Sequence, residues 1–260
     1  MKVSIVTISF NSVRTIEKTI LSVLKQTYNN IEYIIIDGGS TDGTVDIIKK
    51  YQNKIKYWES EKDKGISDAF NKGIKLATGE IIGILNSDDW YELGTIKTVV
   101  SKLSDPEIDY LVGSIRYWDE CGNNFIVLPD KKYQDEIRYK MPKLNHPASI
   151  FKRKVYESVG TFDINYRYAM DYDFFLRVFL ANMHADFTNT VLTNMNSAGA
   201  SDKHAIIAYK ESYKIAPDKF RAGLFFIYAT CKYYLRKLLS KIGLDSLTIS
   251  IRKIKYKNNS

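Results

Sequence analysis

The sequence predicts an α/β fold in which a mostly parallel β-sheet is flanked by helices and followed by a basic helical extension. In the first 90 residues, short apolar runs rich in β-branched residues alternate with segments of helical periodicity. The apolar runs lack a polar face, which is typical of strands covered by helices on both sides. Lysine and arginine are concentrated in the last fifth of the chain, which indicates a separate basic extension.

The first half is predicted to alternate between strand and helix. The first strand has β-branched residues at most of its apolar positions, and Ser12 is a suitable N-cap for the helix that follows. The apolar segment IEYIII forms the second strand and stops at Asp37. In chain order, strands are expected at residues 2–9, 31–36, 54–58 and 80–85, with helices at 13–26, 41–51 and 66–77.

Polar residues gather where three of these strands end. Ser9 and Phe10 lie at the end of the first strand, Asp37 follows the second, and residues 86–89 follow the fourth. The carboxyl ends of parallel strands share one edge of the sheet, and ligands of such sheets bind there. The sequence therefore predicts a binding site at this edge.

After about residue 105 the pattern changes to mixed strands. Strands are expected at 108–117 and 124–127 around a turn, and at 148–151 behind the sequence Asn-His-Pro. Residues 171–180 form a helix with apolar residues on nearly every face, which predicts that this helix is buried. This half is expected to add the second side of a cleft.

The chain has 260 residues and a formal net charge of +8, which is unevenly spread. Residues 1–202 contain 25 Lys and Arg against 27 Asp and Glu, whereas residues 203–260 contain 13 against 3. This excludes an evenly basic nucleic-acid binder, so no nucleic acid is expected as a partner. Cys121 and Cys231 lie far apart, which excludes a disulfide scaffold and suits a cytoplasmic protein. The apolar run at the N-terminus is too short to predict a signal peptide.

Asn86, Ser87, Asp88 and Asp89 follow an apolar strand, and two adjacent carboxylates at such a place need a positive partner. Mg²⁺ or Mn²⁺ prefers oxygen ligands and can bridge protein carboxylates to a diphosphate. The alternative is a solvated turn whose aspartates cap the next helix.

Asp37 opens the segment DGGSTDGT, where a carboxylate could accept a hydrogen bond from a nucleobase and glycines allow close approach. Phe10 at the same edge could stack on that base. The alternatives are a glycine-rich turn before a helix and ordinary core packing of Phe10. The segment is neither G-x-G-x-x-G nor a P-loop, which excludes those two kinds of nucleotide site.

Four segments together resemble the inverting nucleotide-sugar glycosyltransferases of family 2, which have the Rossmann-related GT-A fold. In chain order they are SIVTISFN, DGGSTDGT, SEKDKGISDAFNKGIKLATGEIIGILNSDD and NHPASIFKRKVYESVGTFDINYRYAMDYDFFLR. The resemblance runs from residue 3 to about residue 180. It implies a glycosyltransferase domain at 1–204, with a nucleotide-sugar half at 1–105 and an acceptor half at 106–204.

The resemblance implies that five residues contact the nucleotide. Ser9, Phe10 and Asp37 match positions that hold the uracil and ribose. Asp68 and Asn71 match the loop and helix that close over the nucleotide.

The resemblance also implies a metal site. Asn86 and Ser87 match the beginning of the family's Asp-x-Asp motif, where they are expected to contact the nucleotide-sugar, and Asp88 matches the carboxylate that binds Mn²⁺ or Mg²⁺. Two positions depart from the family pattern. Asn86 replaces the first Asp of the motif, and Gly38 stands where many members have a second Asp.

Asp171 matches the Asp of the family's Glu-Asp pair and is the implied general base, although Met170 replaces the Glu. An inverting transfer needs one carboxylate to take the proton of the acceptor hydroxyl. Asp171 could also cap the helix after it, and Asp173 is the rival for the catalytic role. His146 is either structural or an acceptor contact, and His204 is a candidate for a third metal ligand.

Residues 205–260 are expected to form a basic amphipathic helical tail. Its longest apolar run, residues 222–231, is half of the about 20 residues that a helix needs to cross a bilayer. We expect the tail to hold the protein on the anionic inner face of the cell membrane. The alternatives are a helix that binds another subunit and a helix packed on the core. In the membrane interpretation, truncation after residue 205 releases the protein and leaves transfer intact.

These observations lead to one principal hypothesis and two alternatives. The principal one is an inverting, metal-dependent transfer of a sugar from a nucleotide-sugar, with UDP as the expected nucleotide. The acceptor is a hydroxyl of a glycan or a lipid-diphosphate-linked saccharide in surface-polysaccharide biosynthesis, such as O-antigen, capsule or exopolysaccharide. The first alternative is a catalytically impaired nucleotide-sugar binding scaffold, which the departures at Asn86 and Met170 would fit. A nucleotidyltransferase would need a glycine- and lysine-rich loop that residues 7–11 do not provide.

Overall fold

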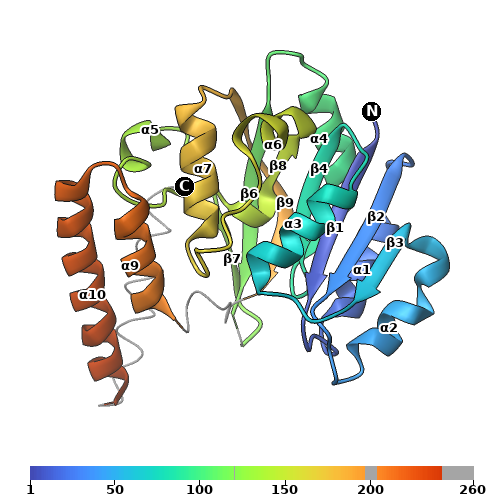
Figure 1. The fold of residues 1–260 in the computed structure, drawn as a ribbon, viewed down its shortest axis with the longest axis horizontal. Coiled ribbons are helices and arrows are strands. Elements are labelled where there is room, and N and C mark those ends of the chain that lie inside the picture. The colour runs from blue at the N-terminus through green and yellow to red at the C-terminus, as the bar shows by residue number, and fades with distance from the viewer. Residues whose placement is uncertain (120, 197–203, 242–260) are drawn as a thin grey trace.

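A computed structural model describes residues 1–119, 121–196 and 204–241, and these form a nine-stranded sheet with helices on both faces (Figure 1). The strand order is β3-β2-β1-β4-β8-β6-β9-β5, and β7 pairs with β6 at the side of this path. Residues 242–260 of the predicted tail and residues 197–203 of the predicted acceptor half lie outside the described residues.

The N-terminal half is the predicted parallel sheet. Its elements are β1 (Val3–Ser9), α1 (Ile16–Leu24), β2 (Ile31–Asp37), α2 (Thr44–Lys50), η1 (Gln52–Lys54), β3 (Tyr57–Ser60), α3 (Ile66–Leu76) and β4 (Ile81–Asn86). Strand β1 lies between β2 and β4, and all four strands run in parallel. The third strand begins three residues later than predicted, because η1 includes Lys54 and the pairing with β2 begins only at Tyr57.

The second half contains the predicted mixed strands and two strands that were not predicted. Its elements are β5 (Trp90–Tyr91), α4 (Thr95–Leu103), β6 (Tyr110–Trp118), β7 (Asn124–Val127), α5 (Tyr133–Glu136), η2 (His146–Ala148), β8 (Ser149–Lys152), α6 (Arg153–Val159), α7 (Met170–Leu180) and β9 (Ala185–Asn196). Strand β8 joins β4 in antiparallel orientation and extends the sheet to β6 and β9. The strands missed by the sequence analysis are β5 and β9, which pair with each other.

Two apolar clusters cover the two faces of the sheet. Residues such as Phe70 of α3 and Phe174 of α7 pack on one face, while Ile20 of α1 and Val99 of α4 pack on the other. Helix α3 lies very close to β1, because a Cβ on Gly73 would stand 2.2 Å from a methyl of Val6. Burial of both faces explains why these parallel strands are mostly apolar.

The described part of the tail consists of α9 (Ala205–Ile215) and α10 (Lys219–Lys241). Figure 1 shows α10 as the outermost helix, with α9 between it and α7. Ala216 and Ala222 are buried in the same cluster as α7. Arg221 donates a hydrogen bond of 2.8 Å to Asp135. The beginning of the tail is therefore packed on the core, so truncation after residue 205 is expected to disturb the domain. Among the described helices, none is long and apolar enough to cross a membrane.

Candidate active site

The register of the parallel strands brings the predicted edge residues together. Ser9 of β1 is level with Asp37 of β2, and Asp37 is level with Ser60 of β3. On the other side of β1, Ile8 is level with Asn86 of β4. The carboxyl ends of four strands thus meet at one edge, as the sequence predicts.

Asp37 is fully buried at this edge and is surrounded by hydrogen-bond donors. Its Oδ1 accepts hydrogen bonds from the hydroxyls of Ser9 (2.7 Å) and Ser40 (2.6 Å). Its Oδ2 accepts from the Ser60 hydroxyl (2.6 Å) and from the backbone N–H groups of Gly39 (3.2 Å) and Ser40 (2.8 Å). Burial acts to raise the pKa of Asp37, but these donors outweigh it and hold the pKa below its usual value. Asp37 therefore organises the ends of three strands.

Phe10 lies beside this network, with 64% of its surface exposed. That exposure excludes ordinary core packing, which was the alternative to a stacking role. An exposed aromatic ring at a ligand-binding edge is available to stack on a flat group.

The acidic segment after β4 is buried without a positive partner among the described residues. Asp89 is 1% exposed, and its Oδ2 accepts a hydrogen bond of 3.1 Å from the Asn86 side chain. Burial raises the pKa of Asp89 well above its usual value, and the charge of Asp88 adds to that increase. Burial also raises the pKa of Asp88. Two carboxylates in such surroundings are costly to ionise together unless a cation neutralises them.

These residues fit a hard divalent cation. Asp88 is only partly buried, whereas Asp89 is enclosed and bonded to Asn86, so Asp88 is the carboxylate that can extend to a ligand. Within the described residues, no cluster of three or more His, Cys, Asp or Glu side chains could hold a metal by itself. A cation at Asp88 would therefore complete its coordination with water or a diphosphate.

Ser87 and Asn71 both form protein contacts in this structure. The Ser87 hydroxyl is 2.7 Å from that of Ser12, which ties the loop after β4 to the loop after β1. Asn71 donates to the carbonyl of Phe162 (2.8 Å) and accepts from its N–H (2.9 Å). Asp68 accepts from the N–H of Lys64 (3.0 Å) at the beginning of α3. The nucleotide contacts expected of these residues stay predictions.

Asp171 and Asp173 stand in the first turn of α7 but have different neighbours. Asp173 forms an ion pair with Arg177, with an N–O distance of 2.7 Å. Asp171 lies near His146, and its Oδ1 accepts from the N–H of Tyr172 (2.8 Å). Burial raises the pKa of Asp171, while His146 and the N–H of Tyr172 act in the opposite direction. The pKa of Asp171 therefore lies above the usual value of an aspartate, which makes its carboxylate more basic.

The two histidines left open by the sequence both contact aromatic rings. His146 lies among Phe70, Phe162 and Phe175, with ring centroids 5.8–6.3 Å apart. Burial lowers the pKa of His146, and the charge of Asp171 opposes that change. His204 stacks on Tyr168, with ring centroids 4.8 Å apart. These contacts favour a packing role for both rings.

Glu211 of α9 contacts the loop that leads into α7, which the sequence analysis did not anticipate. Its carboxylate accepts hydrogen bonds from three successive backbone N–H groups, those of Arg167 (3.1 Å), Tyr168 (2.8 Å) and Ala169 (2.9 Å). No periodicity or motif could indicate this contact, because it joins segments more than 40 residues apart. The tail thus holds the loop immediately before Asp171.

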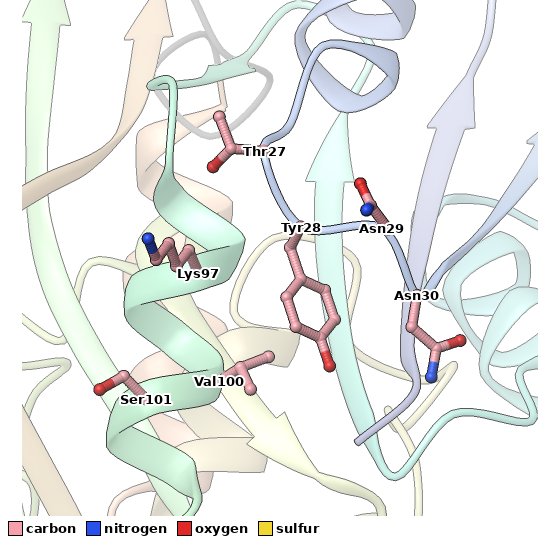
Figure 2. Close-up of a pocket in the computed structure, with 7 residues that line it drawn as sticks. All are labelled: Thr27, Tyr28, Asn29, Asn30, Lys97, Val100 and Ser101. Atoms are coloured by element: carbon pink, nitrogen blue, oxygen red, sulfur yellow. The ribbon is translucent and has the colours of Figure 1, made fainter.

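A hollow of about 500 Å³ lies at the opposite edge of the sheet (Figure 2). It is lined by residues 27–30, which precede β2, and by Lys97, Val100 and Ser101 of α4. Lys97 is its one charged lining residue, and the hollow includes none of the predicted site residues. It is not a second candidate for the acidic site.

Comparison with known proteins agrees with this geometry. The sequence profile of glycosyl transferase family 2 matches residues 4–160. An uncharacterized glycosyltransferase of Mycobacterium tuberculosis is 32% identical over 196 residues, covering 68% of this chain and 69% of the relative. A PGL/p-HBAD biosynthesis glycosyltransferase of Mycobacterium bovis is 26% identical over 233 residues, covering 85% and 86%.

Solved structures show the same fold. Residues 1–349 of Staphylococcus aureus TarS, in complex with UDP-GlcNAc, have a TM-score of 0.63 at 18% identity, covering 92% of this chain and 73% of that TarS fragment. The mannosyltransferase PcManGT of Pyrobaculum calidifontis, in complex with GDP-Man and Mn²⁺, has a TM-score of 0.63 at 19% identity, covering 90% and 70%. The chain therefore belongs to glycosyl transferase family 2 and has the GT-A fold.

Proposed function

We propose that this glycosyltransferase moves a sugar, with inversion at the anomeric carbon, from a UDP-sugar to a hydroxyl of a glycan or lipid-diphosphate-linked acceptor. The observation that carries the proposal is the Asp88–Asp89 pair, in which Asp88 is partly and Asp89 fully buried. Both carboxylates have raised pKa values and lie on the strand edge that also presents Phe10. Complexes of structural relatives with UDP-GlcNAc and with GDP-Man and Mn²⁺ support a nucleotide-sugar and a divalent cation. The acceptor belongs to surface-polysaccharide biosynthesis in this proposal.

Asp171 performs the proton transfer in the proposed reaction. The acceptor oxygen attacks the anomeric carbon from the face opposite the diphosphate, and Asp171 accepts the proton of the attacking hydroxyl. The bond between the sugar and the diphosphate breaks as the new glycosidic bond forms. A bound Mn²⁺ or Mg²⁺ would supply positive charge to the departing diphosphate.

The neighbours of the two α7 aspartates support this assignment of the base. Asp173 forms an ion pair with Arg177, which also donates to the carbonyls of Val159 and Thr161. The Asp173 carboxylate therefore helps to hold the end of α6 and the loop after it against α7. Among the described residues, no cationic side chain forms an ion pair with Asp171. Its raised pKa makes it a better proton acceptor than an exposed carboxylate.

A panel of sugar nucleotides tests the proposal. The protein is incubated with each donor, Mn²⁺ and a lipid-diphosphate acceptor, and nucleoside diphosphate release is measured. Steady turnover with a UDP-sugar and product of inverted configuration supports the proposal. Binding without turnover for every donor and acceptor supports the scaffold hypothesis, and turnover restricted to GDP- or ADP-sugars contradicts the nucleotide assignment.

Glu211 is expected to position the loop before the base. Glu211→Ala removes the acceptor of three backbone N–H groups, and hydrogen bonds to a charged group are worth about 1.5–3 kcal/mol each. We expect kcat to fall by about tenfold or more while KM for the donor is unchanged, because the strand edge is not touched. Glu211→Gln keeps a carbonyl acceptor and should recover part of kcat. A change in donor KM with no change in kcat would contradict this role.

One face of helix α10 supports a membrane-facing role for the tail. Its exposed apolar side chains project within about a third of the helix circumference. They are Phe220, Leu224, Ile227, Tyr228, Tyr234, Leu235 and Leu238. By helical spacing, Arg236 flanks one side of this stripe and Lys237 flanks the other. We propose that this stripe lies in the interface of an anionic membrane at the cytoplasmic face, with the basic residues near lipid headgroups.

Leu235→Glu is expected to weaken binding to vesicles that contain anionic lipid by about tenfold or more, because insertion of a leucine contributes about 1.5–3 kcal/mol and the new charge is repelled. Cosedimentation measures the partition. Leu93→Glu is the matched control, since Leu93 is also exposed but lies in the loop between β5 and α4. Equal losses in the two variants, or equal binding of the unaltered protein to neutral vesicles, would contradict the membrane proposal.

A further inference from the structure

The carboxylate of Asp37 has no lone pair left for a nucleobase. Its two oxygens together accept five hydrogen bonds from protein donors, and the side chain is fully buried. A carboxylate offers about four lone-pair sites, so a further donor could bind only if one of these bonds broke. The geometry therefore argues against the base contact predicted for Asp37. A second carboxylate lies beside the next residue, Gly38.

That carboxylate belongs to Asp63, in the loop between β3 and α3. A Cβ placed on Gly38 would lie 2.6 Å from Asp63 Oδ2 and 3.4 Å from the ring of Phe10. Asp63 Oδ2 therefore rests against the backbone of Gly38, immediately beside the exposed ring. Its other oxygen, Oδ1, accepts a hydrogen bond of 2.8 Å from the N–H of Gly65, which holds the carboxylate in this orientation.

We propose that Asp63 recognises the base of the nucleotide by accepting the N3–H of uracil while Phe10 stacks on the ring. Asp63 Oδ2 forms no hydrogen bond with the described residues, so it is available to a ligand. An aromatic face together with an acceptor at its edge is the usual arrangement for holding a base and testing its Watson–Crick edge. Cytosine has an acceptor at N3, so the same oxygen repels it. This inference rests on the proposed function and adds the residue that selects the base.

Asp63→Asn tests the proposal with little change of shape. The asparagine keeps an oxygen to accept the N–H of Gly65 and replaces the other oxygen with an N–H donor. We expect the affinity for UDP in the presence of Mn²⁺ to fall by about tenfold or more, because the site then faces uracil N3–H with a donor. Affinity for CDP is expected to stay equal or to rise. Isothermal titration calorimetry measures both, so the readout does not require an acceptor or turnover.

Asp130→Asn is the matched control. Its Oδ1 accepts the N–H of Lys132 at 2.9 Å, in the same local turn that Asp63 forms with Gly65, but on the loop before α5. UDP and CDP affinities of this variant should equal those of the unaltered protein. If Asp63→Asn also retains the preference for UDP over CDP, Asp63 is only a turn residue and the inference is overturned.

Gly38→Ala provides a second, independent test. Its methyl group would displace Asp63 Oδ2, so the preference for UDP should fall in this variant as well. In the double variant with Asp63→Asn the two losses should not add, since both act on one contact. Fully additive losses would overturn the inference. Absence of any nucleoside diphosphate binding by the unaltered protein would contradict the proposed function, whereas GDP binding that depends on Asp63 would make guanine the recognised base and overturn the assignment of uracil.

Discussion

Replacement of Asp88 by alanine is expected to abolish transfer, with a loss of about 10³-fold or more. Stabilising the charge that develops on a departing diphosphate is worth several kcal/mol, and Asp88 is the carboxylate that can extend to the cation. The affinity for nucleotide-sugar should lose its dependence on Mn²⁺, because the remaining acid, Asp89, is enclosed and bonded to Asn86. Titration of UDP with and without Mn²⁺ measures this change separately from the rate.

The control for this variant is Asp46→Ala, which removes an exposed carboxylate from α2. It should leave both the rate and the response to Mn²⁺ unchanged. Because Asp88 is partly buried beside Asp89 and its pKa is raised, its removal is also expected to leave thermal stability unchanged or higher. Full metal-stimulated activity of Asp88→Ala would end the assignment of the metal site.

Asp171→Asn is expected to lower turnover by about 10²–10⁴-fold while nucleotide binding is retained, which is the range for loss of general-base assistance. The amide has nearly the same size and still accepts the N–H of Tyr172. The unaltered enzyme should lose activity on the acid side as Asp171 takes up a proton. Because burial raises the pKa of Asp171, this loss should begin at a higher pH than for an exposed aspartate, whose pKa is about 3.9.

Asp173→Asn is the matched control on the same turn of α7. It breaks the ion pair with Arg177, and partly exposed pairs contribute about 0–1 kcal/mol, so the melting temperature should fall by a few degrees at most. Turnover should remain within about threefold of the unaltered enzyme, since this carboxylate serves a structural contact. A large loss in Asp173→Asn together with an active Asp171→Asn would show that the wrong carboxylate was chosen.

The sequence by itself determined the parallel half of the sheet and the edge on which the candidate site residues gather. Nearly continuous apolar runs such as residues 31–36, in which Glu32 is the one charged residue, predict strands covered on both faces, and the polar residues at their ends then share one edge. The ordered segments from residue 3 to about residue 180 also identified the family, which the profile match over residues 4–160 confirms. These features depend on short stretches of sequence, or on the rule that the carboxyl ends of parallel strands share one edge. The order of residues along the chain is therefore enough to predict them.

The placement of the second half was decided only by tertiary structure. Strand β9 contains many polar residues and pairs with β6 in parallel orientation. Strand β8 pairs with β4 in antiparallel orientation. Neither the order nor the register of such strands is encoded by periodicity, because both depend on which apolar faces meet across the sheet. The late start of β3 has the same origin, since it is set by pairing with β2.

Tertiary contacts also decided which carboxylates are available for chemistry. Asp37, Asp63, Asp171 and Asp173 have the same side chain, yet Asp37 is saturated by donors and Asp173 is bound to Arg177. The sequence pattern could not distinguish them, because hydrogen bonds and burial come from residues distant in the chain, and these set both the pKa and the free lone pairs. The contact of Glu211 with the loop before Asp171 likewise joins residues distant in the chain. Because of this contact, the beginning of the tail is part of the folded domain, although its charge differs from that of the rest of the chain.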